Sequence, residues 1–141
     1  MIMGIGADLL RIERIARMGE RNGRIMLDRM LAAPERAALA GLGDHPADWP
    51  GCAARIAALV AAKEAFFKAL GTGLVMPLRW ADVAVGGPRV APTVTLSGAA
   101  AAAFSAQGGT ACRLTLSATQ DFILATVALF GRGATTGNTY A

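Results

Sequence analysis

The segment that decides the fold runs from Ala53 to Leu70 and reads AARIAALVAAKEAFFKAL. Gly71 follows it directly, and glycine is the residue that most often ends a helix. Many of the remaining positions are alanine, which favours close packing against neighbouring elements over a core of large rings. The large apolar side chains recur at helical spacing, at Ile56, Leu59, Val60, Phe66, Phe67 and Leu70. The pattern therefore predicts one long central helix.

The segments on either side of this helix predict shorter helices and several strands. Residues 2–10 read as a buried strand that delivers Asp8 near its end. Residues 11–42 carry apolar side chains at roughly helical spacing with breaks at Gly23 and Pro34, which predicts two or three short helices. A loop is expected at 41–51, an alanine-rich helix at 98–107, and strands at 83–85, 90–96, 114–116 and 122–130. This order predicts an α+β fold, an antiparallel sheet packed with a long central helix and short helices.

The size and composition of the chain fit one domain. The sequence has 141 residues, of which 54% are hydrophobic, and this is enough for a core. We expect residues 1–130 to form that domain and residues 131–141, which lose the hydrophobic pattern, to form a flexible tail. No apolar run is long enough to cross a hydrocarbon layer of about 30 Å, and the first residues do not resemble a secretory signal. We therefore expect a cytoplasmic protein without a membrane partner.

Three charged residues are candidates for catalysis. Glu64 and Lys68 are four residues apart on the predicted helix, so their side chains share one face. Asp8 could join Glu64 as a ligand of a hard cation such as Mg²⁺, which commonly takes one or two protein carboxylates together with waters and phosphate oxygens. Two simpler interpretations stay open on spacing alone. Glu64 and Lys68 could form a solvated surface pair, and Asp8 could be a helix N-cap.

Two further patterns predict contacts with anionic groups. The residues Gly71-Thr72-Gly73 could bring backbone amides close to a phosphate, although a helix C-cap explains the same glycines. A net charge of +4 favours an acidic partner. Arginines at three- or four-residue spacing would form a basic ridge suited to an acidic helix, or else a solvated face shared with Glu13 and Glu20. These arginines are Arg11, Arg14, Arg17, Arg21 and Arg24.

Two blocks of the sequence resemble one known family. The first block is Gly4-Ile5-Gly6-Ala7-Asp8-Leu9-Leu10-Arg11-Ile12-Glu13-Arg14-Ile15, and the second is Ala61-Ala62-Lys63-Glu64-Ala65-Phe66-Phe67-Lys68-Ala69-Leu70-Gly71-Thr72-Gly73. They resemble the GIGxDxxxIxRI opening and the AAKEAxxKALGTG helix of the holo-[acyl-carrier-protein] synthases, the small trimeric type of 4′-phosphopantetheinyl transferase. Weaker similarity in residues 30–39 and 116–121 extends the resemblance over about residues 1–130.

The resemblance implies a 4′-phosphopantetheinyl transferase-like fold and a specific reaction. A serine of an apo acyl carrier protein would attack the β-phosphorus of the substrate coenzyme A, which releases adenosine 3′,5′-bisphosphate. The resemblance also implies that Asp8 and Glu64 bind the cofactor Mg²⁺ and that Lys68 lies beside the reacting phosphate. For the general base, a metal-bound water, Glu64 and Lys68 all remain candidates, and we favour Lys68 mainly as an electrostatic clamp.

The resemblance assigns the remaining contacts to two groups of residues. A homotrimer with active sites between subunits is implied, with a basic ridge that docks the acidic helix of the carrier protein. The ridge is centred on Arg14 and includes Arg17, Arg21 and Arg24. The residues implied to hold coenzyme A are Lys63, Gly71, Thr72, Gly73, Ser117 and Thr119.

Departures from the family pattern concern the coenzyme A site. Leu59 stands where an arginine often precedes the AAKEA run, and Ala118 stands where the family usually has histidine. Arg55, about one turn earlier on the helix, is a candidate substitute for these lost polar groups. The element that is usually LTPAE reads Ala32-Ala33-Pro34-Glu35 at its end here.

These departures keep an alternative function open, namely a catalytically impaired homologue that binds coenzyme A or a nucleotide. Such a protein would bind its ligand without transferring the phosphopantetheine arm. A nucleic-acid-binding module is disfavoured because the basic residues lack interleaved aromatic side chains.

Overall fold

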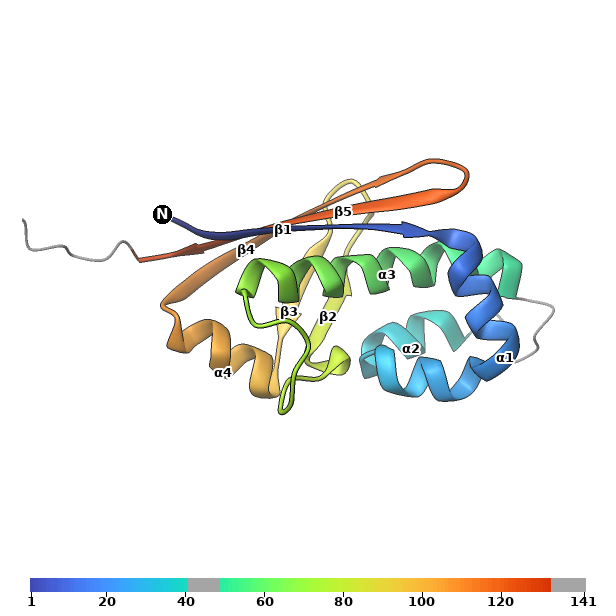
Figure 1. Ribbon diagram of the computed structural model, residues 1–141, viewed down its shortest axis with the longest axis horizontal. Helices are drawn as coiled ribbons and strands as arrows, with labels where there is room; N and C mark the ends of the chain where they lie inside the picture. The colour runs from blue at the N-terminus through green and yellow to red at the C-terminus, as the bar shows by residue number, and fades with distance from the viewer. Residues whose placement is uncertain (41–48, 133–141) are drawn as a thin grey trace, which may run out of the picture.

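The computed structural model describes residues 1–40 and 49–132 (Figure 1). It confirms the predicted α+β class, with an antiparallel sheet and one long helix. In chain order the elements are β1 (Ile2–Arg11), α1 (Ile12–Met30), α2 (Ala33–Leu39), α3 (Trp49–Leu70), the 3₁₀ turn η3 (Trp80–Asp82), β2 (Val83–Gly86), β3 (Thr93–Leu96), α4 (Gly98–Ala106), β4 (Gly109–Ala118) and β5 (Phe122–Gly131).

The main sheet has three strands in the order β1-β5-β4, and both pairings are antiparallel. Helix α3 runs along one face of this sheet, while β2 and β3 form a separate hairpin that passes behind α3 in this view, with its turn beyond the sheet (Figure 1). The central strand β5 turns Ile123, Ala125, Val127 and Leu129 into the core, as the alternation of side chains along a strand requires. The sheet therefore has one face on α3 and one face without a covering layer in the described chain.

Helix α3 is buried on most of its circumference, as expected for a helix that is apolar nearly all round. The Phe66 and Phe67 rings meet edge to face with centroids 5.5 Å apart, and Phe67 packs in the same way on Trp80 at 6.4 Å. These contacts hold α3 against the η3 turn. The long helix thereby becomes the fixed support for the residues that it carries toward the surface.

Two glycines of β1 allow this strand to lie directly on α3. A Cβ atom added at Gly4 would fall less than 3.0 Å from the Ala69 carbonyl oxygen, and one added at Gly6 less than 3.0 Å from the Ala65 carbonyl oxygen. Any side chain at these two positions would push the strand away from the helix. Asp8 follows on the same face of β1, two residues after Gly6, so it lies next to α3.

The helical segments differ from the sequence prediction in two places. Helix α3 begins at Trp49, so the predicted loop is wrong for residues 49–51, and its remaining residues 41–48 lie outside the described part of the chain. The break predicted at Gly23 is found one residue earlier, at Asn22, where the backbone leaves the helical conformation with φ of −139° and ψ of 25°. Helix α1 continues beyond this kink to Met30.

The strands differ in length from the prediction. Strand β4 extends over Gly109–Ala118 because it pairs with β5 along nearly its whole length, glycine included. Strand β3 is shorter than predicted and begins at Thr93, because residues 88–91 form a turn closed by a hydrogen bond from the Ala91 amide to the Pro88 carbonyl. Gly131 belongs to β5 and not to the predicted tail. Residues 133–141 of that tail lie outside the described residues.

Candidate active site

Asp8 and Lys68 form an ion pair where β1 crosses α3. The Lys68 ammonium nitrogen lies 2.7 Å from Asp8 Oδ1 and also donates to the Ala7 carbonyl oxygen at 3.2 Å. The side chain of Lys68 is 52% exposed and that of Asp8 is 14% exposed. The carboxylate is thus held by the fold, whereas the ammonium group remains accessible to a ligand.

Glu64 belongs to the same charged cluster. Burial raises the pKa of its carboxyl group above the ordinary value, and the negative charge of Asp8 raises this pKa further. The positive charges of Lys68 and Arg14 act in the opposite direction. Glu64 and Lys68 lie one turn apart on α3, and Lys68 forms an ion pair with Asp8, so the three predicted catalytic residues lie on one side of this helix. Arg14 lies close enough to act on the Glu64 carboxyl group.

The donor set of this cluster fits a magnesium ion. Within residues 1–40 and 49–132, no three or more His, Cys, Asp or Glu side chains are grouped so that they could hold a metal. Two carboxylates are instead the typical protein contribution to Mg²⁺, which keeps waters and substrate phosphate oxygens as its other ligands. A cation between Asp8 and Glu64 would also remove the repulsion that raises the pKa of Glu64.

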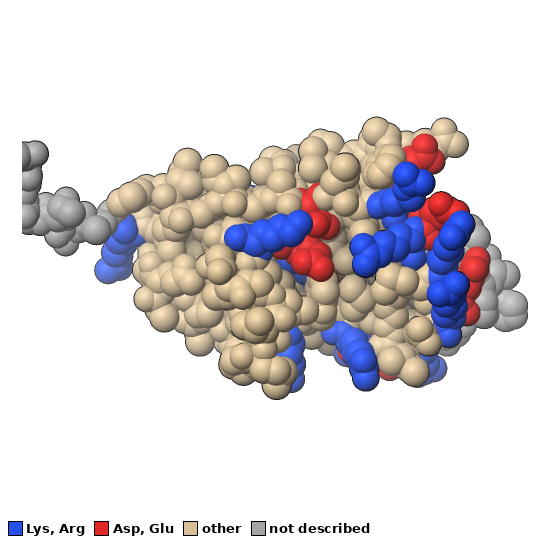
Figure 2. All heavy atoms as spheres, in the orientation of Figure 1, with Lys and Arg blue, Asp and Glu red and all other residues tan. Residues whose placement is uncertain are grey.

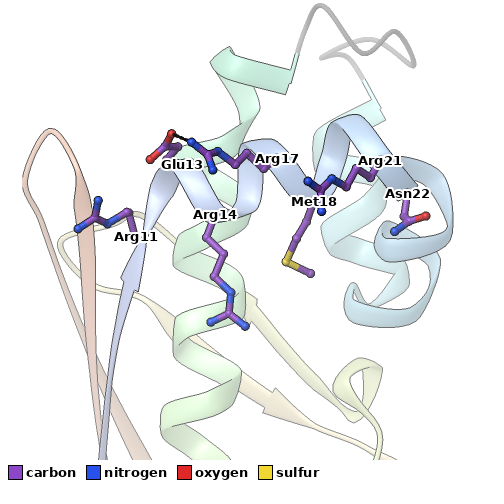
Figure 3. Close-up of a pocket in the computed structure, with 7 residues that line it drawn as sticks. All are labelled: Arg11, Glu13, Arg14, Arg17, Met18, Arg21 and Asn22. Atoms are coloured by element: carbon purple, nitrogen blue, oxygen red, sulfur yellow. Dashed lines mark hydrogen bonds and ion pairs between the residues drawn. The ribbon is translucent and has the colours of Figure 1, made fainter.

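A basic groove of about 500 Å³ lies next to the cluster, along α1. In Figure 2, basic side chains gather over the end of the molecule that α1 occupies. Figure 3 shows the side chains of the groove, with Arg14 extending along α3 and Met18 between the arginines. The groove is lined by Arg11, Glu13, Arg14, Arg17, Met18, Arg21 and Asn22. Arg14 belongs to this groove and also acts on Glu64, so it connects the two features.

The predicted ridge is only partly one surface. Arg14, Arg17 and Arg21 line the groove, and Arg17 forms an ion pair with Glu13 at 2.5 Å. Arg24 is exposed but does not line the groove, because it follows the kink at Asn22. The three- and four-residue spacing predicted a continuous ridge, and the kink interrupts that spacing.

The turn Gly71-Thr72-Gly73 follows α3 and begins three residues after Lys68. Gly71 and Gly73 have φ values of +78° and +63°, which residues with side chains rarely adopt. The Gly71 amide donates to the Lys68 carbonyl oxygen at 3.1 Å, as in a helix C-cap, and the Thr72 hydroxyl donates to the Gly73 carbonyl oxygen at 3.0 Å. All three residues are exposed, so this turn is accessible beside the charged cluster.

A second cavity, of about 570 Å³, lies between α2, the first half of α3, the β2–β3 hairpin and the β4–β5 end of the sheet. It collects several residues that the sequence singled out, namely Arg55, Leu59, Ala118 and Thr119. Thr119 Oγ1 accepts hydrogen bonds from the Asp121 and Phe122 amides at 3.3 and 3.1 Å, which shapes the β4–β5 turn. Leu59 and Ala118, two of the departures from the family pattern, are thus found on the wall of one cavity.

Ser117 is not among the residues that line this second cavity. It is exposed, and it alternates with Leu116 and Ala118, which line the cavity. Because successive side chains of a strand point to opposite faces, Ser117 lies on the sheet face that turns away from α3. Within one chain, Ser117 and Thr119 therefore lie in different surroundings.

Lys63 requires a correction. Its side chain is fully buried, and the ammonium nitrogen donates to Glu35 Oε2 at 2.7 Å, to the Trp80 carbonyl oxygen at 3.1 Å and to the Val83 carbonyl oxygen at 2.5 Å. An ammonium group has three donors, and all three are used inside the protein. The prediction that Lys63 holds coenzyme A is wrong for this structure, in which Lys63 is an internal residue.

Glu35 is the partner that sequence reasoning missed. It is 3% exposed and receives hydrogen bonds from the Ala32 and Val85 amides at 2.7 and 2.8 Å, in addition to the bond from Lys63. Glu35 therefore ties α2, α3 and β2 together. The available signal was the run Ala32-Ala33-Pro34-Glu35, in which a glutamate at the third helical position can reach back to the N-cap amide.

The charged cluster and the second cavity lie on opposite sides of α3. Arg55 precedes Glu64 by nine residues, which is two and a half turns, so the two side chains leave the helix in nearly opposite directions. Asp8 belongs to β1 and Ala118 to β4, which are the two outer strands of the main sheet. Within one chain, the carboxylates and the cavity therefore lie on different sides of α3.

Comparison with known proteins gives one consistent result. Residues 4–127 match the 4′-phosphopantetheinyl transferase superfamily. The holo-[acyl-carrier-protein] synthase of Rhodopseudomonas palustris is 42% identical over 128 residues, which is 89% of this chain and 90% of the relative. The protein of the same description from Trichlorobacter lovleyi is 38% identical over 118 residues, which is 83% of this chain and 88% of the relative.

Solved structures agree with the sequence relatives. The acyl carrier protein synthase of Plasmodium yoelii with ADP bound has a TM-score of 0.84 at 27% identity, and covers 94% of this chain and 97% of its own. The Helicobacter pylori holo-[acyl-carrier-protein] synthase in complex with coenzyme A has a TM-score of 0.69 at 26% identity, and covers 89% of this chain and 99% of its own. The chain therefore belongs to the holo-[acyl-carrier-protein] synthases of the 4′-phosphopantetheinyl transferase superfamily.

Proposed function

We propose that this protein transfers the 4′-phosphopantetheine group of coenzyme A to a serine of an apo acyl carrier protein. The observation that carries the proposal is the cluster of Asp8, Glu64 and Lys68 at the contact between β1 and α3. The descriptions of the relatives support the reaction, and the coenzyme A complex of the Helicobacter pylori protein supports the donor. We take residues 1–130 as the transferase domain.

Each residue of the cluster would have a different role. Asp8 and Glu64 would hold Mg²⁺, which when bound supplies the positive charge that the pyrophosphate oxygens need in the transition state. Lys68 would place its accessible ammonium group on the phosphate under attack, because its ion pair with Asp8 fixes its position. The Gly71 amide of the exposed turn is used by the Lys68 carbonyl oxygen, so the amides of Thr72 and Gly73 would bind the neighbouring phosphate oxygens.

The transfer itself forms one bond and breaks one bond. The serine oxygen of the carrier protein attacks the β-phosphorus of coenzyme A and gives its proton to a base, for which Glu64 and Lys68 both remain candidates. The bond from this phosphorus to the bridging oxygen breaks. Adenosine 3′,5′-bisphosphate leaves, and the arm remains on the serine as a phosphodiester. In this scheme Lys68 acts as an electrostatic clamp on the phosphate.

The basic groove would dock the carrier protein. Arg11, Arg14, Arg17 and Arg21 present positive charge along a cavity of about 500 Å³, and this charge suits an acidic helix. Arg14 lies in the groove and also affects Glu64, so a helix bound there would be adjacent to the catalytic cluster. Docking and chemistry would then occur on one continuous surface.

We infer further that the protein works as a homotrimer with active sites between subunits. The sheet face that turns away from α3 exposes Ile5 and Leu9 at 64% each and Leu124 at 41%, and Leu9 pairs with Leu124 across β1 and β5. An apolar sheet face of this kind favours association. Since α3 separates the carboxylates from the cavity, a site assembled from two subunits would let one coenzyme A molecule reach both.

The experiment that tests the function is intact mass spectrometry of an apo acyl carrier protein incubated with this protein and coenzyme A. We expect a mass gain of one phosphopantetheine group with Mg²⁺ and no gain with EDTA. Glu64→Gln should abolish the gain while circular dichroism shows an unchanged fold, and Arg29→Gln, outside the cluster and the groove, should behave as wild type. Coenzyme A binding without any gain across several carrier proteins would instead establish the catalytically impaired homologue.

A further inference from the structure

The last carbonyl group of α3 is held by a residue far along the chain. Gln107 donates a hydrogen bond from Nε2 to the Leu70 carbonyl oxygen at 3.1 Å. The carbonyl groups at the end of a helix have no partner within the helix, so a side chain that donates to one of them supplies a bond that the helix itself lacks. Leu70 directly precedes the Gly71-Thr72-Gly73 turn. Gln107 therefore binds the backbone at the point where α3 passes into this turn.

Both polar groups of the peptide unit between Leu70 and Gly71 have partners. The carbonyl oxygen accepts the bond from Gln107, and the N–H group, which belongs to Gly71, donates to the Lys68 carbonyl oxygen at 3.1 Å. These two groups lie in one plane and point in opposite directions across a trans peptide bond. Rotation of the plane would break both hydrogen bonds, so its orientation is fixed from two sides.

The two glycines of the turn have few packing contacts of their own. Apart from the chain neighbours, no atom of the described residues lies within 4 Å of a Cβ added at Gly71 or Gly73. Their φ values of +78° and +63° are readily reached by glycine, which also has the largest freedom to leave them. The directions of the Thr72 and Gly73 amides therefore depend on the peptide plane that precedes them.

Gln107 is itself attached to a well-bonded part of the fold. Its amide donates to the Ala103 carbonyl oxygen of α4 at 3.2 Å, and the Gly108 amide donates to the Ser105 carbonyl oxygen at 2.9 Å. The Gly108 carbonyl oxygen accepts a hydrogen bond from the Arg132 amide at 3.2 Å. Helix α4 lies near the C-terminal end of α3, at the end of the molecule opposite α1 (Figure 1). The side chain of Gln107 thus connects the end of α3 to a backbone that is fixed on both sides.

Resting on the proposed function, we infer that Gln107 is a positioning residue that orients the Thr72 and Gly73 amides for the phosphates of coenzyme A. Gln107 does not touch the substrate and acts through the Leu70–Gly71 peptide unit. Donors that are oriented in advance bind a phosphate without an added cost of ordering them during binding. Loss of Gln107 therefore weakens the binding of coenzyme A and leaves the groove along α1 unchanged.

NMR of the free protein tests the orienting role without any transfer reaction. Gln107→Met removes the donor at similar length, and Gln107→Lys keeps a donor that can reach the end of a helix. We expect the Gly71 amide to exchange with solvent about 3- to 10-fold faster in Gln107→Met, as for the loss of one hydrogen bond. The order parameters of Thr72 and Gly73 should decrease in Gln107→Met and recover in Gln107→Lys. Unchanged exchange and order parameters in Gln107→Met would overturn the inference.

A kinetic readout separates positioning from a merely structural role. In the transfer assay, Gln107→Met should raise the KM for coenzyme A by about 3- to 10-fold and leave the KM for the carrier protein unchanged. The matched control is Ser105→Ala, a change at an exposed residue of α4, which should behave as wild type. An equal rise in both KM values, or no rise, would overturn the inference while transfer by the wild type continues. Absence of transfer by the wild type would instead overturn the proposed function.

Discussion

Glu64 receives opposing electrostatic effects from the residues around it. Burial is the largest, the carboxylate of Asp8 adds to it, and the cations Lys68 and Arg14 partly cancel both. Its protonation is therefore controlled by three neighbours at once. If Glu64 binds a cation only when ionised, transfer should fall as the pH decreases through this raised pKa.

We predict that single substitutions move the pKa of Glu64 in opposite directions. In the metal-free protein this pKa should lie above the ordinary value of 4.5. Asp8→Asn removes a negative charge and should lower the pKa, whereas Lys68→Met removes a positive charge and should raise it further. Carbon-13 NMR titration of glutamate-labelled protein measures each value, and Arg29→Gln serves as the control. Identical pKa values in all variants would show that Glu64 is outside the cluster.

The second prediction at this scale concerns the buried pair of Lys63 and Glu35. Lys63→Met or Glu35→Gln alone leaves one buried charge without its partner, so each should lower the free energy of unfolding by about 3–5 kcal/mol. The double variant should lose clearly less than the sum of the two single losses, because neither charge remains. Urea denaturation of all four proteins measures the difference. Strictly additive losses would show that the two side chains do not depend on each other.

At the scale of elements, the contact between β1 and α3 sets the position of the catalytic carboxylates. Gly6 has no space for a Cβ atom, because the Ala65 carbonyl and the Ala69 amide of α3 lie against it. The strand that carries Asp8 and the helix that carries Glu64 and Lys68 therefore meet backbone to backbone. A small change in their spacing would separate the charged groups.

We predict that Gly6→Ala lowers the free energy of unfolding by roughly 1–3 kcal/mol, because the added methyl group overlaps the backbone of α3. Transfer activity should decrease more than stability alone explains, since Asp8 moves away from Glu64. The matched control is Gly51→Ala, where, apart from the chain neighbours and the backbone of α3 itself, no atom of the described residues lies within 4 Å of the added Cβ. That change should be neutral or stabilise α3 by up to about 1 kcal/mol. Thermal denaturation and the transfer assay test both, and equal behaviour would contradict the close approach.

The kink in α1 leads to a second prediction at the scale of elements, which concerns the arginines on either side of it. Arg21→Glu should raise the KM for the carrier protein by about tenfold and reduce its salt dependence, because Arg21 lines the groove. Arg24→Glu makes the same change of charge beyond the kink and should have a much smaller effect. Initial rates at several salt concentrations measure both. If both variants raise the KM for the carrier protein equally, the whole face of α1 docks the carrier, as the arginine spacing had predicted.

At the scale of the whole molecule, the carboxylates of the proposed site lie on one side of α3, and the cavity of about 570 Å³ lies on the other. Subunits with Glu64→Gln lack a carboxylate but keep the cavity, and subunits with Ala118→Trp keep the carboxylates but fill the cavity. We predict that each variant alone is inactive and that co-expression of the two restores part of the transfer activity. Native mass spectrometry verifies that mixed oligomers form. Mixed oligomers without activity would place the complete site within one subunit.

The sequence predicted the parts of the site that depend on local spacing. Glu64 and Lys68 share a helix face because they are one turn apart, and Asp8 follows Gly6 by one strand period. The residues that the sequence misassigned depend on partners far along the chain. Lys63 was predicted to face the ligand, but Glu35, 28 residues away, holds it in the interior.

Taken by itself, the sequence determined the long central helix, the α+β order and the three charged residues of the cluster, because helical and strand periods are local properties of the chain. Only the tertiary structure decided which charged side chains are internal and which are available. It placed Gln107 against the Leu70 carbonyl group, interrupted the ridge at Asn22, and set the cluster and the cavity on opposite sides of α3. These arrangements follow from packing between distant segments, and no local spacing encodes such packing.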